Sequence, residues 1–337
     1  MKRRESRFGL NSLRVAAGAA LVAALLVGGG GAAQEVDVES FAQWREGVRS
    51  EALELGISAA TFDRAFEGIE PIPRIIELDR HQPETTITFA EYMERVVPES
   101  RVAQGRELLA AHRDLLEPIG RKFGVPPRFI VALWGIETSY GRYLGGFPVI
   151  GALATLAHDG RRSDYFRQEL MHALRILEDG HIAPEAMVGS WAGAMGQSQF
   201  MPSSFVRYAV DYDGDGRRDI WGTQGDVFAS AANYLVQAGW RTGETWGRAV
   251  RLPEGFDPAL VGLEVSKSLD DWRALGLRRA DGSDLPQVAI SGSVVLPGGE
   301  EGPAYLVYGN YRTIMRWNRS FYFATAVGTL ADRIGGR

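Results

Sequence analysis

One carboxylic acid interrupts an otherwise uncharged helical stretch of the sequence. Glu137 lies near the carboxyl end of a predicted helix over residues 128–140, and its neighbours one turn away are Leu133, Trp134 and Tyr140. Burial among such side chains and the negative end of the helix dipole both disfavour the ionised carboxylate, so we expect a raised pKa for Glu137. A carboxyl group that stays protonated near neutral pH can act as a general acid. On this local pattern alone, a solvent-facing glutamate at a helix end is the alternative.

A second stretch with closely spaced polar side chains covers residues 189–204. Its sequence, Gly-Ser-Trp-Ala-Gly-Ala-Met-Gly-Gln-Ser-Gln-Phe-Met-Pro-Ser-Ser, interleaves glycines with amide and hydroxyl side chains. Glycines let a backbone approach a ligand closely, and amides and hydroxyls can bind sugar hydroxyl and acetamido groups. The stretch therefore suits an extended polar ligand, although a tight packing turn before a predicted helix at 203–210 would have the same composition.

A third stretch, from Asp211 to Asp219, carries carboxylates at alternating positions with a turn glycine between them. This spacing is typical of an EF-hand calcium loop. Gly222 stands at the twelfth position, where that loop usually has a bidentate glutamate, so a later carboxylate would have to serve through a longer loop. A solvated acidic turn is the alternative. The candidate metal ligands are Asp211, Asp213, Asp215, Asp219 and Asp226.

Composition argues against several other classes of function. The 337 residues carry a formal net charge of −5, and nucleic-acid binding needs a clustered basic face. The absence of cysteine excludes disulfides, thiolate metal sites and a lipid-bearing cysteine. His158, His172 and His181 lack the spacing of a zinc site, and residues 196–200 lack the second glycine of a serine-hydrolase elbow. We therefore expect no nucleic-acid partner, no zinc centre and no serine nucleophile.

The first 33 residues have the pattern of an export signal. Basic residues between Lys2 and Arg14 precede the uncharged run Val15–Val27, and small residues up to Ala33 offer a cleavage site. The run is short for a bilayer span of about 20 residues, but counting through Ala33 nearly reaches that length, so an uncleaved membrane anchor is the alternative. Either form predicts that the rest of the chain works in the periplasm. No other segment is apolar enough to span a membrane.

The rest of the chain is predicted to be mainly helical. Apolar residues recur at spacings of three and four over 36–116, while Pro71, Pro73 and Pro83 predict an extended connection over 70–88. Turn signals between short apolar runs over 246–308 predict a small module with strands, and a helical pattern returns over 310–334.

We expect five parts: the signal peptide or anchor at 1–33, an N-terminal helical region at 34–120, a core with the EF-hand-like loop at 121–245, a small mixed module at 246–309, and a C-terminal helix at 310–337 that packs back on the core.

Taken together and in this order, the motifs resemble the lytic murein transglycosylase B family. The resemblance is strongest over residues 124–240 and extends more weakly over nearly all of the chain after residue 33. It implies a mainly α fold: a lysozyme-like helical core with an additional helical region and a small α+β module. The matching motifs are Gly124-Val-Pro-Pro, Gly135-Ile-Glu-Thr, Ala152-Leu-Ala-Thr-Leu, Arg161-Arg162, Ser190-Trp-Ala-Gly-Ala-Met-Gly, Gln199-Phe-Met-Pro-Ser-Ser, Ala231-Ala-Asn-Tyr-Leu and Arg316-Trp-Asn-Arg-Ser.

The resemblance implies a role for each matching side chain. It makes Glu137 the catalytic acid, and it places Arg161 and Arg162 along the cleft, where they could meet lactyl or peptide carboxylates of muramic acid. Trp317 stands where a tyrosine is usual and keeps an aromatic surface, whereas Phe323 replaces a tyrosine and loses its hydroxyl. The resemblance also supports a structural calcium ion at the acidic loop. The implied substrate-binding residues are Tyr92, Arg161, Arg162, Ser190, Gln199, Tyr234, Trp317, Asn318 and Phe323.

The activity that the resemblance implies needs one acid. Glu137 would protonate the glycosidic oxygen between MurNAc and GlcNAc in peptidoglycan while the MurNAc 2-acetamido group assists departure. As a carboxylate it would then take the proton of the C6 hydroxyl, which closes on C1 and leaves a 1,6-anhydro-MurNAc end. No cofactor is required for this chemistry. The implied partners are peptidoglycan glycan strands, with other cell-wall enzymes as further candidates, and we expect the protein to act as a monomer.

Two other functions remain open on the sequence. A hydrolytic muramidase would need a second carboxylate that activates water, and Asp159 and Asp164 are nearby in sequence. A non-catalytic glycan-binding protein would keep the polar and aromatic cleft residues while losing the acid. Glu137 is present, which favours an enzyme.

Overall fold

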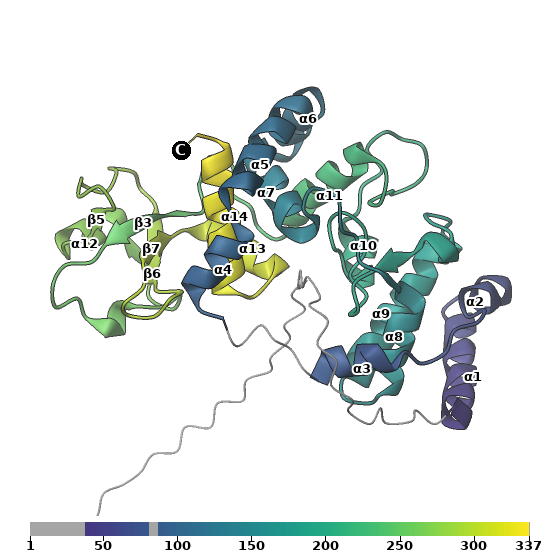
Figure 1. Ribbon diagram of the computed structural model, residues 1–337. Helices are drawn as coiled ribbons and strands as arrows, with labels where there is room; N and C mark the ends of the chain where they lie inside the picture. Colours follow the sequence, from purple (N-terminus) through teal and green to yellow (C-terminus); the bar gives the residue numbers. More distant parts are fainter. Residues whose placement is uncertain (1–37, 81–86, 337) are drawn as a thin grey trace, which may run out of the picture.

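The computed structural model describes residues 38–80 and 87–336, so the predicted signal segment at 1–33 lies outside the described residues. Helices form most of this part of the chain, and a five-stranded antiparallel sheet lies at one end of the molecule (Figure 1). The predicted mainly helical fold with a small strand module is thereby confirmed. Within these two ranges, no helix has the length and hydropathy needed to cross a bilayer.

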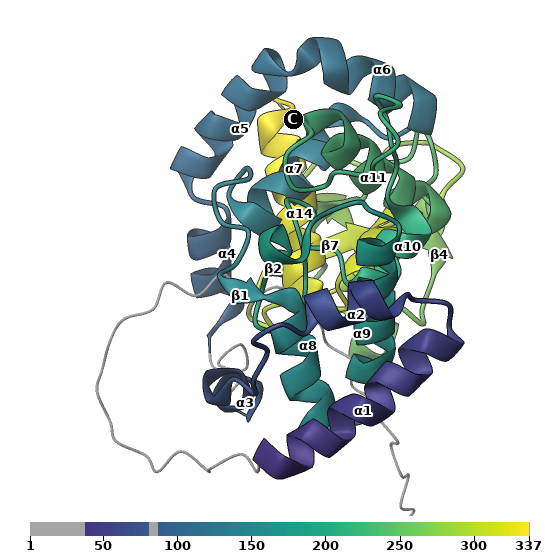
Figure 2. The ribbon, with the colours of Figure 1, turned by 90° about the vertical axis from the view of Figure 1, so that its right-hand side faces the viewer.

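The first lobe is built around two apolar helices from the middle of the chain, α8 and α9. Every residue of α8 from Val149 to Ala157 is buried, which is typical of a helix covered on all sides. The N-terminal helices α1–α3 lie against this pair, as Figure 2 shows from a second side. The lobe consists of α1 (Val38–Glu54), α2 (Ala59–Ala65), α3 (Pro73–Arg80), α8 (Val149–His158), α9 (Ser163–Glu178), α10 (Pro202–Tyr208) and the antiparallel pair β1 (Phe147–Pro148) and β2 (Val188–Gly189).

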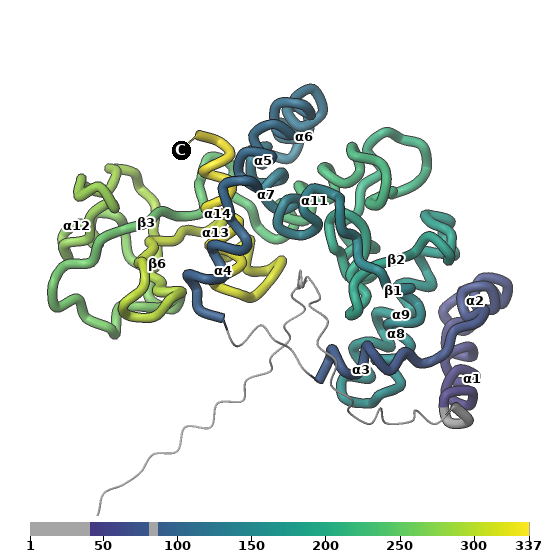
Figure 3. Tube along the Cα trace, viewed as in Figure 1, coloured from purple at the N-terminus to yellow at the C-terminus, as the bar shows by residue number. Residues whose placement is uncertain are grey.

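The second lobe surrounds α7, the helix that carries Glu137. Every residue from Phe129 to Thr138 is buried, and α7 packs against α5, α6, α11 and α14. Pro127 opens the helix at a position where a missing backbone N–H removes no helical hydrogen bond. Figure 3 follows the chain from the first lobe to the second and back again. The helices are α4 (Phe89–Val96), α5 (Glu99–Ala111), α6 (Arg113–Phe123), α7 (Pro127–Thr138), α11 (Gln224–Gln237), α13 (Gly309–Trp317) and α14 (Phe321–Ile334).

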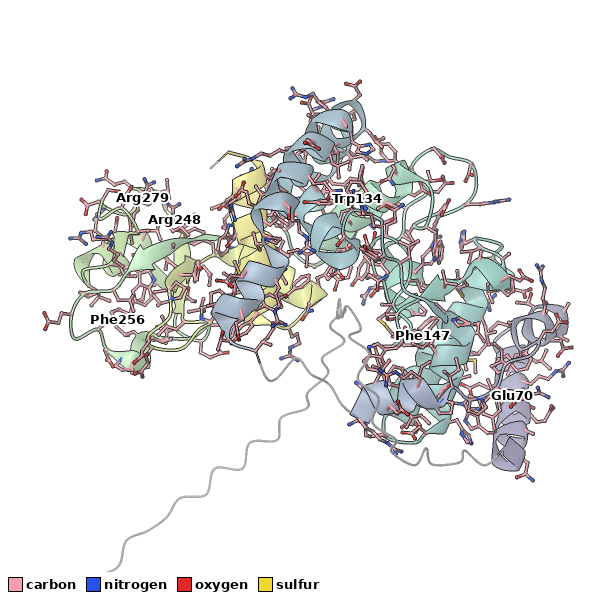
Figure 4. All side chains as sticks on the ribbon, in the orientation of Figure 1. Glu70, Trp134, Phe147, Arg248, Phe256 and Arg279 are labelled. Atoms are coloured by element: carbon pink, nitrogen blue, oxygen red, sulfur yellow. The ribbon has the colours of Figure 1, made fainter. Side chains whose placement is uncertain are left out.

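The sheet and one short helix form a strand module beside the second lobe. Its strand order is β4-β6-β7-β3-β5, and Trp272 of the short helix is fully buried in a third core, where its indole donates to the Gly292 carbonyl at 2.8 Å. In Figure 4, Arg248 and Arg279 mark this module and Glu70 lies at the opposite end of the molecule. The elements are β3 (Gly247–Arg251), β4 (Lys267–Ser268), α12 (Leu269–Ala274), β5 (Arg278–Arg279), β6 (Ser291–Val295) and β7 (Ala304–Val307).

The prediction of an extended connection over residues 70–88 is wrong for its middle part. Helix α3 begins at Pro73 and continues to Arg80. A proline at the first helical position has its φ already set for the helix, so it starts this element instead of preventing it. Ile75 on α3 is fully buried against the first lobe, which supplies the packing that the local pattern did not reveal.

The single C-terminal helix predicted over 310–334 is two helices. The chain leaves α13 after Trp317, because Asn318 has an extended backbone with φ −142° and ψ 121°. Ser320 then caps α14 by accepting a hydrogen bond from the Phe323 backbone N–H at 3.3 Å. The break leaves Trp317 as the last residue of α13.

Helix α3 is tied to the turn between α8 and α9 by a buried carboxylate. Asp79 is 2% exposed and accepts hydrogen bonds from two neighbouring guanidinium groups, those of Arg161 and Arg162. The Arg161 Nε atom lies 2.8 Å from Asp79 Oδ2. Next to this cluster, Arg80 pairs with Asp159 at 3.0 Å. Both pairs join the same two segments, so they fix the end of α3 beside that turn.

We expect Asp79→Asn to destabilise the protein, because it leaves two guanidinium groups without their carboxylate. Hydrogen bonds to charged groups contribute about 1.5–3 kcal/mol each, but solvent screens partly exposed arginines, so we expect a loss of roughly 1–2 kcal/mol in the free energy of unfolding. Urea denaturation followed by circular dichroism measures it. Glu67→Gln, on an exposed glutamate, is the control. Equal stability of Asp79→Asn and the unmodified protein would contradict this role.

Candidate active site

Glu137 is buried in the last turn of α7, with 5% of its surface exposed. Burial raises the pKa of its carboxyl to about 8, and a hydrogen bond from Trp317 opposes part of that rise. The carboxyl therefore stays protonated near neutral pH. Its surroundings explain this, since the other residues that line the small cavity beside it are apolar or neutral: Ile130, Leu133, Trp134, Gln197, Ser198, Val227, Phe228, Ala231 and Trp317.

A sharp change of backbone direction follows Glu137. Ser139 and Tyr140 have left-handed φ values of 49° and 63°, and Gly141 has φ 80°. Left-handed φ in residues other than glycine costs roughly 1–3 kcal/mol and is often found at functional sites. The Tyr140 hydroxyl donates to the Arg101 carbonyl at 2.7 Å. A Cβ atom at Gly141 would lie 2.4 Å from Gln197 Oε1, so this position requires glycine for space as well as for φ.

Gln197 connects the polar loop to α7. Its Oε1 accepts hydrogen bonds from Trp134 Nε1 at 2.8 Å and from Gln224 Nε2 at 3.1 Å, while its Nε2 donates to the Trp221 carbonyl at 2.9 Å. Because an indole N–H can only donate, this network fixes the orientation of the amide. Figure 4 labels Trp134 on α7, near the middle of the molecule. Neither Gln197 nor Trp134 was predicted as a site residue from the sequence, since no spacing rule pairs residues 63 positions apart.

The predicted sugar-binding residues Ser190 and Gln199 hold the loop in shape. Ser190 Oγ accepts a hydrogen bond from the Ala194 N–H at 3.0 Å. Gln199 has a left-handed φ of 47°, and its Nε2 donates to the carbonyls of Leu144 and Gly196 at 3.1 and 3.0 Å. These bonds make a compact, fixed loop beside α7.

Aromatic rings gather next to Glu137. The ring centroids of Tyr234 and Trp317 are 4.6 Å apart, and those of Phe200 and Trp317 are 5.2 Å apart. The Tyr234 hydroxyl donates to the Arg316 carbonyl at 2.7 Å. Aromatic faces can pack on the apolar faces of sugar rings, so this cluster suits a glycan. Trp317 packs against the cores of both lobes.

The remaining predicted sugar-binding residues are not among the described residues that line the small cavity at Glu137. Phe323 is 4% exposed and belongs to the second core, so packing accounts for its ring. Arg161 and Arg162 bind Asp79 in the first lobe. Tyr92 lies on α4 with its ring 5.4 Å from that of Tyr322. Asn318 is partly buried at the break between α13 and α14.

Three of the five predicted metal ligands converge. Oxygen atoms of Asp211, Asp213 and Asp226 all lie within 4.8 Å of one another, and Asp215 and Asp219 are outside this group. Asp219 accepts from the backbone N–H groups of Trp221 and Gly222 and from the Thr223 hydroxyl, so it serves the turn before α11. Desolvation raises the pKa of Asp226, with Asp213 and Asp211 adding like charge.

Comparisons with known proteins identify the family of this chain. Residues 40–332 match the transglycosylase SLT domain family. The chain is 32% identical to membrane-bound lytic murein transglycosylase B of Escherichia coli (strain K12) in an alignment over 281 residues that covers 76% of this chain and 72% of that protein.

Two solved structures are similar over most of this chain. SltB3 from Pseudomonas aeruginosa, in complex with NAG-anhNAM-pentapeptide, is 46% identical with a TM-score of 0.86, covering 88% of this chain and 80% of that one. The Escherichia coli lytic transglycosylase Slt35, in complex with calcium, is 28% identical with a TM-score of 0.74, covering 88% and 92%. The chain therefore belongs to the transglycosylase SLT domain family, as the motifs predict, and it is a lytic transglycosylase.

Proposed function

We propose that this lytic transglycosylase cleaves the β-1,4 bond between MurNAc and GlcNAc in peptidoglycan, with Glu137 as its single acid and base. The observation that carries the proposal is the burial of Glu137 in a neutral cavity, which raises the pKa of its carboxyl to about 8. The complex of the similar SltB3 with NAG-anhNAM-pentapeptide supports both the substrate class and the anhydro product.

The two proton transfers follow from the state of this one carboxyl. In its protonated form, Glu137 donates a proton to the glycosidic oxygen, and the C1–O bond breaks while the MurNAc 2-acetamido group stabilises the charge at C1. Glu137 is now a carboxylate and accepts the proton of the C6 hydroxyl. The O6 atom bonds to C1, which gives a 1,6-anhydro-MurNAc end and returns Glu137 to its acid form. No water is consumed.

The surroundings of Glu137 favour this route over hydrolysis. Among the described residues that line the cavity, no second carboxyl is present to activate water. Asp159 is paired with Arg80 in the first lobe, and Asp164 is exposed in the first turn of α9. Neither candidate for the water-activating base therefore lines the cavity.

The acidic loop fits a structural calcium ion. Backbone N–H groups of Gly214 and Gly216 hold the Asp211 carboxylate at 2.7 and 2.9 Å, and the Tyr212 N–H holds Asp226 at 2.7 Å. These bonds hold two of the three carboxylates whose oxygen atoms lie within 4.8 Å of one another, and oxygen donors are the ligands that calcium prefers. The ion would relieve the repulsion between Asp226 and its acidic neighbours. The calcium complex of the similar Slt35 supports the assignment.

The working site of the enzyme is proposed to be the periplasm. Glycan strands of peptidoglycan lie there, and the pattern of residues 1–33 predicts export. Mature protein from the native host that begins near Gln34 would support a cleaved signal, and retention of Met1 to Ala33 would support an anchor.

We expect Glu137→Gln to lose nearly all turnover of purified sacculi, because the amide keeps the shape of the side chain but neither donates the acid proton nor accepts one. General acid–base catalysis contributes roughly a hundred- to ten-thousandfold, and one group here serves both steps. Mass spectrometry of the released muropeptides counts the anhydro ends. Asp164→Asn is the matched control and should retain near-normal activity. Activity of Glu137→Gln close to that of the unmodified enzyme would refute the assignment.

Calcium should raise the melting temperature of the enzyme, because a ligand that binds only the folded state stabilises it by about 2.7 kcal/mol at a hundredfold excess over its dissociation constant. Asp213→Ala should abolish this rise, while Glu264→Gln, which removes one exposed charge in the strand module, should preserve it. Differential scanning fluorimetry with and without a chelator measures both. A melting temperature that does not change when calcium is added would contradict the calcium site, and the loop would then be a solvated acidic turn.

A further inference from the structure

Trp317 makes a direct hydrogen bond to the proposed catalytic acid. Its indole Nε1 donates to Glu137 Oε1 at 2.8 Å. Within the described chain, no other residue donates a hydrogen bond to the Glu137 carboxyl. The two residues are 180 positions apart, and the break after α13 places the indole at the end of its helix.

The packing of the indole fixes the direction of this N–H. Tyr234 on α11 and Phe200 in the polar loop contact the ring, with centroids 4.6 and 5.2 Å away. Trp317 also contacts the hydrophobic cores of both lobes. A ring held by two other rings and two cores has little freedom to turn, so the N–H points at one oxygen of Glu137.

We infer that Trp317 is a positioning residue that assigns the acid proton to Oε2 of Glu137 and reserves Oε1 as an acceptor. The inference rests on the proposed function of Glu137 as acid and base. An indole N–H can only donate, and a protonated carboxyl has one O–H and one carbonyl oxygen. The carbonyl oxygen is the better acceptor for the indole, so the proton lies on the other oxygen.

The same hydrogen bond serves both stages of the reaction. Before cleavage it directs the O–H of Glu137 away from the indole and toward the glycosidic oxygen. After cleavage it stabilises the negative charge of the carboxylate through Oε1, so that Oε2 is free to accept the proton of the C6 hydroxyl. Hydrogen bonds to an ionised group are stronger than those to a neutral one, so the N–H favours proton release at the moment when charge develops.

Among residues 38–80 and 87–336, no charged side chain other than Glu137 itself lines the cavity. The elements that line the cavity, α7, α11, α13 and the polar loop, present apolar or aromatic side chains and the neutral Gln197 and Ser198 to it. Tyr234 is a titratable group whose charge couples to Glu137, and burial raises the pKa of its phenol to about 12, so it is neutral over the working range.

The test replaces the indole N–H without changing the shape of the ring. Benzothienylalanine, in which sulfur takes the place of the N–H, is introduced at position 317 by nonsense suppression, and Trp317→Phe and Trp317→Tyr are made alongside. The pH dependence of kcat and KM is measured on soluble glycan oligomers for each full-length enzyme. Activity needs protonated Glu137, so kcat falls as the pH rises through the pKa of that group.

We expect the N–H-free analogue to lower kcat about tenfold with KM changed by less than about threefold, and to move the alkaline limb of kcat upward by about one pH unit. Trp317→Tyr, which keeps a donor, should recover part of kcat, and Trp317→Phe should not. An unmoved alkaline limb in the analogue, or a change confined to KM, would mean that Trp317 only stacks on sugar and would overturn the inference. Glu137→Gln distinguishes failure of the inference about Trp317 from failure of the proposed function. If Glu137→Gln stays active, the proposed role of Glu137 as acid and base is wrong, whatever the Trp317 variants show.

Discussion

The burial of a single carboxyl group without a cationic partner is the constraint on which the site depends. An ionised carboxylate is strongly disfavoured in such surroundings, so Glu137 is kept as a neutral acid with its pKa raised to about 8. A nearby lysine or arginine would reverse this effect, and the described residues lining the cavity include neither. One indole N–H is the group that favours the charged form. The carboxyl can therefore both give up and regain a proton near neutral pH.

Three segments far apart in the sequence must meet for this constraint to hold. Helix α7 belongs to the second lobe, the polar loop at 189–204 joins the first lobe to it through Gln197, and the break after α13 brings Trp317 from the C-terminal part of the chain. The left-handed turn at Ser139 and Tyr140 ends α7 directly after Glu137. Since all three segments pack on buried cores, the site is set by rigid parts of the fold, which suits catalysis that depends on the placement of one proton.

The sequence allowed the chemistry to be predicted better than the contacts that tune it. A glutamate in an apolar helix predicted a raised pKa for Glu137, and burial explains it. The hydrogen bond from Trp317 to Glu137 could not be predicted, because it joins residues 180 positions apart. It also depends on a break between two helices, whereas the apolar pattern over 310–334 predicted one continuous helix. Asp79, the partner of Arg161 and Arg162, could not be predicted either, because it lies more than 80 positions earlier in the sequence. Local patterns report neighbours along the chain, while these partners come from tertiary packing.

Direct titration of the Glu137 carboxyl tests the central claim most directly. Infrared difference spectra between the unmodified enzyme and Glu137→Gln isolate the protonated carboxyl band as the pH is raised. The account predicts that this band persists at neutral pH and disappears with a midpoint at about 8. A midpoint near the ordinary value of 4.5 would show that Glu137 is ionised at neutral pH, and it would contradict the single-acid account.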